Sequence, residues 1–185
     1  MKPGALLISQ PFLGDPNFER TVVLLCRHAP AEGSFGLVLN RASNLTLGDV
    51  LELPLGDVSP AAPLPLHLGG PVEPNTLHYL HQRADLPDAT DLGQGTHWGG
   101  DFEVLLGLLQ AGEVDAGEVR LYAGYSGWGA GQLEGEIEQQ VWILHPPAAG
   151  KVFTLDTDAF WRTILREKGG RYKALANYPI DPRLN

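Results

Sequence analysis

Short apolar runs separated by glycine and proline recur along the chain. Residues 5–9, 21–27 and 35–40 are rich in leucine, isoleucine and valine, and turn-forming residues bound each run. Runs of this length and composition are typical of β-strands. The same pattern predicts further strands at residues 66–68, 77–82, 118–123 and 141–144.

A second periodicity, near 3.6 residues, predicts helices. Apolar side chains recur at this spacing between residues 102 and 109, after Asp101 and before Gly112, which are typical start and stop signals. Residues 158–168 form the clearest helix, with Asp158 as the expected cap and glycines at its end. Shorter helices are expected at residues 132–139 and within residues 47–53.

Three stretches lack periodicity. Residues 54–65 contain four prolines and predict a surface loop, residues 84–95 are irregular, and the tail 178–185 has two prolines. The chain has no internal repeat. Residues 1–185 are therefore expected to form one α+β domain, with a mixed sheet, a few short helices and long loops.

Composition narrows the classes of function. The 185 residues carry a formal net charge of −9, which disfavours a protein that binds nucleic acid or an anionic membrane through positive charge. The single cysteine, Cys26, excludes an intrachain disulfide and a CxxC motif. The N-terminal apolar run is too short for a signal peptide, and no run is long enough to span a membrane. We therefore expect a cytoplasmic protein.

The densest motif is residues 124–138, which read GYSGWGAGQLEGEIE. A phosphate-binding loop would need Gly or Ala at Gln132 or Lys at Ala130, and the glutamates that follow would compete with a phosphate for the helix N-terminus. A nucleophile elbow around Ser126 would need a glycine at Trp128. The interpretation that remains is a tight, close-packed turn whose carboxylates complement the helix dipole.

Other chemistry-bearing residues predict no metal or cofactor. His78 and His81 are three apart in a predicted strand and therefore point to opposite faces. Cys26 and His28 share the spacing of a thiolate–imidazolium pair, but the apolar run around Cys26 favours a core cysteine. The spacing of Glu134 and Glu138 fits a solvated helix face as well as it fits an acid–base pair.

Four ordered blocks resemble the bacterial YqgE/AlgH family. They are residues 7–11 (LISQP), residues 33–41 (GSFGLVLNR), residues 69–72 (GGPV), and residues 124–134 with Glu136 and Trp142. The resemblance extends from about residue 5 to residue 175. The chain departs from the family at Ser126, where alanine is usual, and at Ala42, where proline is usual. The resemblance implies a compact α+β domain with bifurcated, coiled sheets. It also implies the label of transcriptional regulator, which the family carries without a settled biochemical activity.

We expect a non-catalytic module that binds a small molecule or a protein partner, with an indirect regulatory role. Arg41 is the expected anion contact and Trp128 the expected apolar wall of a pocket. The same motif residues are equally consistent with turns and packing. The candidate binding residues are Asn40, Arg41, Gly69, Gly70, Pro71, His81, Gly124, Tyr125, Gly127, Trp128, Gly131, Gln132 and Glu134.

Two alternatives from other classes stay open. A direct DNA-binding regulator would depend on the bases at Arg162, Arg166, Lys168, Arg171 and Lys173. An enzyme would draw on the acid–base groups of Tyr125, His81 and Glu134, without a defined substrate.

Overall fold

The computed structural model describes residues 1–51 and 59–179. The predicted loop 54–65 and tail 178–185 therefore lie partly outside the described residues. The described part of the loop, residues 59–64, consists mainly of turns, and Ala61 and Leu64 are buried.

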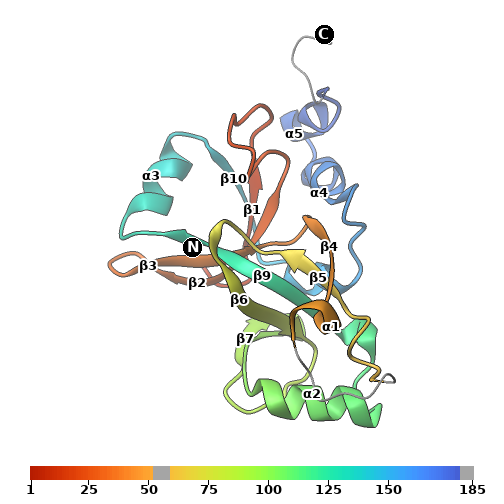
Figure 1. Ribbon diagram of the computed structural model, residues 1–185. Helices are drawn as coiled ribbons and strands as arrows, with labels where there is room; N and C mark the ends of the chain where they lie inside the picture. Colours follow the sequence, from red (N-terminus) through yellow and green to blue (C-terminus); the bar gives the residue numbers. More distant parts are fainter. Residues whose placement is uncertain (52–58, 180–185) are drawn as a thin grey trace.

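A branched sheet forms the centre of the molecule (Figure 1). One half is an antiparallel series of β10 (Trp142–His145), β1 (Leu6–Ser9), β2 (Val22–Ala29) and β3 (Gly33–Val38). The other half contains β6 (Val72–His81), β8 (Thr96–Trp98) and β7 (Thr90–Gly93), with β4 (Ala42–Thr46) and β5 (Pro65–Leu68) on a side branch. β5 runs parallel to β9 (Val119–Trp128). The mixed sheet and the α+β class are thus confirmed.

Strand β9 joins the two halves. Its first part, Leu121–Ala123, pairs with β5 on one side and β6 on the other, and its last part, Ser126–Trp128, pairs with β3. Gly124 marks the change of partner with a φ of 66°, a value that glycine adopts without strain. Two sheets can therefore share one strand.

The described residues also contain five α-helices and two short 3₁₀ turns, Ala116–Glu118 and Ala149–Phe153. The α-helices are α1 (Leu47–Val50), α2 (Phe102–Ala111), α3 (Gln132–Glu138), α4 (Phe160–Lys168) and α5 (Arg171–Leu175). For α2 the expected ends are confirmed, because Asp101 accepts a hydrogen bond from the Val104 N–H at 3.1 Å and Gly112 is left-handed. No helix in the described part combines the length and apolar character needed to cross a bilayer.

The predicted cap of α4 is wrong. Ala159 is the N-cap, and its backbone N–H and that of Asp158 donate to the Asp156 carboxylate at 3.3 and 3.1 Å. An Asx turn at Asp156 thus holds the chain before the helix, whose N-cap lies one residue later than predicted.

Five strands differ from the prediction. Residues 84–95 are not wholly irregular, since they contain β7, and β4 and β8 were not predicted. The strand predicted to begin at residue 77, β6, begins at Val72. The strand predicted to end at residue 123 continues to Trp128, so that Gly129–Gly131 alone connect β9 to α3. Two of the five glycines of this motif, Gly124 and Gly127, therefore belong to a strand, where close neighbours leave little room for side chains.

The buried side chains form three clusters around the sheet. One cluster packs α4 onto the N-terminal strands, where the Trp161 indole donates to the Ser9 carbonyl at 2.9 Å. A second lies between α2 and the β6–β9 half. The third lies under α3 and contains Trp128 and Trp142.

Candidate functional site

A groove of about 620 Å³ opens between β3, β6, β8 and β9. We call it the aromatic groove, because its lining includes Phe35, His78, Trp98, Tyr125 and Trp128. Phe35 lies at the centre of this set, with ring centroids 4.6 Å from Tyr125, 4.7 Å from Trp98 and 5.1 Å from His78. Phe35 is buried, whereas Tyr125, Trp98 and His78 are half-buried and present part of their rings to the groove.

Strand register explains how the groove forms. Phe35 on β3 pairs with Gly127 on β9, and alternation places Tyr125 on the same face of β9 as Gly127. A side chain at 127 would begin 3.1 Å from the Tyr125 ring. The glycine therefore leaves the space in which the Tyr125 ring stacks over Phe35.

Charged side chains form the rim of the aromatic groove. Arg27, Glu32 and Glu73 line it, and none of the three forms an ion pair within the described residues. Glu73 lies in an irregular part of β6 and has a φ of 46°. A glutamate in left-handed backbone is uncommon, and such strain is found more often at functional sites.

His78 lines the groove with part of its ring. Its Nε2 is shielded from solvent and has no hydrogen-bond partner among the described residues. Burial lowers the pKa of His78, and the nearby Glu73 charge opposes that shift. The imidazole is therefore neutral at pH 7 and adds no positive charge to the groove.

A serine–histidine–glutamate row begins at Ser34, which lines the groove. Ser34 Oγ is 2.8 Å from His28 Nδ1, and His28 Nε2 is 3.4 Å from Glu134 Oε1. The Glu134 oxygen forms no hydrogen bond in the described residues, and Ser34 is 7% exposed within β3. The row has the order of a hydrolytic triad but neither an aligned carboxylate nor an exposed nucleophile. We interpret it as a polar tie between β2, β3 and α3.

Trp128 separates the aromatic groove from a second hollow. This tryptophan hollow, of about 290 Å³, is lined by Phe18, Trp128, Trp142 and Glu136, among others. Glu136 Oε2 accepts hydrogen bonds from the Trp128 indole at 2.8 Å and the Trp142 indole at 2.7 Å. The other oxygen accepts from Gln132 at 2.8 Å. One carboxylate therefore fixes the wall of both hollows.

Sequence reasoning did not identify Glu136 as a site residue. Its partners come from β9, β10 and its own helix, and no periodicity connects these elements. A pair of tryptophans flanking an amphipathic acidic helix was the available signal. Buried indole N–H groups need acceptors, and a carboxylate between them supplies one.

Arg41 and Asn40 lie outside the aromatic groove. The Arg41 guanidinium donates to the backbone carbonyls of Pro16 and Glu19 at 2.8 and 2.9 Å. It lines a separate hollow of about 310 Å³ with Gly70 and Pro71. Asn40 accepts from the Val22 N–H at 2.8 Å and donates to the Arg20 carbonyl at 2.9 Å, which ties the segment after β3 to the start of β2.

The adjacent glycines Gly69 and Gly70 allow their backbone to pack closely against β9. A Cβ at Gly69 would lie 2.3 Å from the Gly124 carbonyl oxygen, and one at Gly70 would lie 2.2 Å from the Tyr125 carbonyl oxygen. Ser126 is fully buried, and its hydroxyl donates to the Gly69 carbonyl at 3.1 Å. The hydroxyl is thus committed to holding the two segments together and is closed to a substrate.

Gly131 and Gln132 organise the start of α3. Gly131 occupies the N-cap with a φ of 70°, and Gln132 Oε1 accepts from the Gly129 N–H at 2.9 Å. The carboxylates after it have specific partners, Glu134 beside His28 and Glu136 on the indoles. They therefore make particular contacts in addition to complementing the helix dipole.

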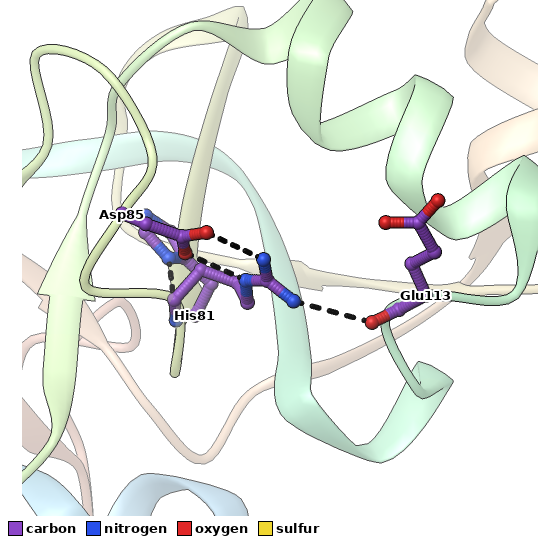
Figure 2. A network of polar contacts seen from close by, with 4 residues as sticks. His81, Asp85 and Glu113 are labelled. Carbon is purple, nitrogen blue, oxygen red and sulfur yellow. Dashed lines mark hydrogen bonds and ion pairs between the residues drawn. The ribbon is translucent and has the colours of Figure 1, made fainter.

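His81 belongs to a different part of the molecule. It is fully buried at the end of β6, where Nδ1 accepts from the Arg83 N–H at 3.2 Å and Nε2 lies 2.9 Å from the Gly99 carbonyl. Figure 2 shows His81 beside Asp85, whose carboxylate accepts from the Arg83 side chain at 2.6 and 2.8 Å. Arg83 also donates to the Glu113 carbonyl at 3.2 Å. His81 therefore connects backbone segments.

We expect acid to destabilise the fold through His67 and His81. Both are buried, and burial lowers the pKa of each below its ordinary value of 6.5. Below about pH 6.5 the two histidines bind protons more readily in the unfolded chain than in the folded chain. The free energy of unfolding therefore decreases as the pH falls. Thermal unfolding should give a constant Tm above pH 7 and a lower Tm at pH 5.5. The difference should shrink in His81→Gln and persist in the control His145→Gln.

Other candidate chemistry is absent from the described residues. No three His, Cys, Asp or Glu side chains converge there as ligands of a metal would. Cys26 is buried, and burial raises the pKa of its thiol well above the ordinary value. Its Sγ contacts the Leu24 carbonyl at 3.6 Å, while His28 turns to Ser34 and Glu134.

The basic residues of the DNA-binding alternative lie on α4 and α5 (blue in Figure 1). Lys168 donates to the Leu144 carbonyl at 2.8 Å, and Arg171 lies over the Tyr172 ring. Arg162 and Arg166 are exposed. None of these bases lines the aromatic groove.

The architecture defines an α+β protein with a branched sheet built on one long shared strand. An AlgH-like family model (DUF179) matches residues 6–173. The chain belongs to this AlgH-like family, which the relatives below also represent under the name UPF0301.

Relatives and solved structures agree with this assignment. A UPF0301 protein from Cytophaga hutchinsonii is 45% identical over 184 residues, covering 98% of both chains. One from Chlorobaculum tepidum is 41% identical, covering 100% of this chain and 96% of the relative. The solution structure of AlgH from Pseudomonas aeruginosa matches with a TM-score of 0.75 and 28% identity, covering 95% of this chain and 93% of that one. Protein DIP2367 from Corynebacterium diphtheriae shares the fold, with a TM-score of 0.72 and 24% identity over 96% of this chain and 93% of that one.

Proposed function

We propose that this protein is a ligand-binding module that holds a small molecule in the aromatic groove without catalysing a reaction. The supporting observation is the cluster of Tyr125, Trp98 and His78 around buried Phe35, beside charged groups that have no ion-pair partner in the described residues. Apolar walls with a few free polar groups are the usual composition of ligand sites.

The nucleophile candidates favour binding over catalysis. Ser126 and Cys26 are buried in the core, and Ser34 is almost fully covered. A regulatory role would then be indirect, with the ligand altering contact with a protein partner. The net charge of −9 supports that route over direct contact with DNA.

A thermal-shift screen tests the proposal. A ligand at about 100 times its Kd stabilises a protein by about 2.7 kcal/mol, which raises Tm by about 5–10 °C at this size. We expect a hit whose shift disappears in Tyr125→Ala and persists in Arg41→Ala, because Arg41 lines a different hollow. A hit lost only in Arg41→Ala would place binding elsewhere and refute the proposal.

A further inference from the structure

The rim of the aromatic groove carries more negative than positive charge. Glu32 and Glu73 contribute two carboxylates against the single guanidinium of Arg27. The whole chain reinforces this sign with its net charge of −9. An anion entering the groove would therefore meet a repulsive field, whereas a cation would be attracted.

The aromatic lining favours the same sign. The faces of aromatic rings carry partial negative charge, and organic cations bind over them. Half-buried Tyr125 and Trp98, with Trp128 at the wall, provide such rings. A flat cation can stack on a ring while its edge reaches a carboxylate.

The rim carboxylates add a requirement for a donor. Glu32 and Glu73 are exposed and form no ion pair within the described residues, so their oxygens can accept from a ligand. A ligand with several N–H groups can donate two of them to one carboxylate. A quaternary ammonium has no N–H to donate, and a guanidinium has five when it bears one substituent.

We propose that the ligand of the aromatic groove is a guanidinium cation, stacked on the aromatic lining and hydrogen-bonded to Glu32 or Glu73. The inference rests on the proposed function and specifies its ligand. The guanidinium belongs either to a free small molecule or to an arginine side chain of a partner, and both present the same chemistry to the groove.

Opposite substitutions at the rim test the sign of the charge. Titration calorimetry would measure the Kd of propylguanidine and of N-acetyl-arginine amide, which carry one positive charge each, with adenosine monophosphate as the anionic probe. We expect both cations to bind, Glu73→Gln to weaken them by about three- to tenfold, and Arg27→Gln to strengthen them by about two- to fivefold. Glu103 is an exposed residue of α2, away from the groove lining, so Glu103→Gln is the matched control and should leave Kd unchanged.

The outcomes separate this inference from the proposed function. Tighter binding of N-acetyl-arginine amide than of propylguanidine supports a partner's arginine, and equal binding supports a free molecule. If neither binds, the cation inference is wrong. If adenosine monophosphate binds, weakens in Arg27→Gln and requires Tyr125, the groove binds a ligand but the cation inference is wrong. If a thermal-shift hit requires Arg41 and ignores Tyr125, both are wrong.

Discussion

Gly69→Ala is expected to destabilise the folded chain severely. The added Cβ would lie 2.3 Å from the Gly124 carbonyl oxygen and 2.9 Å from Leu37 Cδ2. Both contacts are in the packed region where β5 leads into β6 beside β9. The Gly124 carbonyl belongs to the backbone and cannot move without displacing β9. We expect a loss of more than about 4 kcal/mol in the free energy of unfolding, in the range of severe core overpacking. Urea denaturation followed by circular dichroism measures it.

Gly107→Ala is the matched control for that substitution. Gly107 lies inside α2, and a Cβ there meets no atom within 4 Å. Alanine in a helix interior should stabilise the fold by about 0.5–1 kcal/mol. A Gly69→Ala protein with an unchanged urea midpoint would contradict the packing that we describe at the branch.

Glu136→Ala is expected to cost about 2–5 kcal/mol of stability and to loosen both hollows. The substitution leaves the indole N–H groups of Trp128 and Trp142 without their acceptor. Water has little access to these donors, because the two residues are only 6% and 4% exposed. A buried donor left unpaired costs about 1–3 kcal/mol. Urea denaturation measures the loss, and tryptophan fluorescence reports the changed surroundings of the two rings.

Two variants separate the role of the Glu136 carboxylate from a general effect on α3. Glu138→Ala, two residues away and exposed, should change stability by less than about 0.5 kcal/mol. Glu136→Gln keeps one acceptor oxygen and should fall between the other two. Equal stability of Glu136→Ala and Glu138→Ala would refute the bonding assigned to the carboxylate.

Elements with strong local signals were predictable from the sequence. Helix α2 has apolar residues at helical spacing, an aspartate N-cap and a C-terminal glycine. Each of these signals depends only on neighbouring residues in the chain. Strands β4, β7 and β8 lack such signals because they are three to five residues long and partly polar. Their strand conformation depends on partners distant in the sequence, which no local pattern contains.

The glycine-rich motif shows the same limit. Residues 124–128 resemble a loop when judged by composition, yet they extend β9 because Gly69 and Gly70 approach its backbone too closely for side chains. Gly124 uses both properties of glycine, because its φ is 66° and a Cβ there would lie 2.7 Å from the Gly70 carbonyl oxygen. The close approach of Gly70 cannot be recognised from the motif alone.

The candidate site was predictable only in part. Tyr125, Gly127 and Trp128 line the aromatic groove, but Phe35, His78 and Trp98 come from three other strands. The remaining motif residues lie in four other places. These are the contact of Gly69 and Gly70 with β9, the hollow beside Arg41, the start of α3, and the end of β6 at His81. Side chains that meet through strand register have no fixed spacing in sequence, so the motifs indicated the region and not the partners.

A crystallographic fragment screen of the unmodified chain tests the central claim most directly. The soaked library should contain cationic, anionic and neutral compounds in equal numbers. We predict that bound fragments concentrate in the groove lined by Phe35, Trp98 and Tyr125 and that guanidinium-containing ones are enriched among them. An empty aromatic groove, with fragments gathered instead in the apolar hollow beside Leu45 and Val50, would contradict the account.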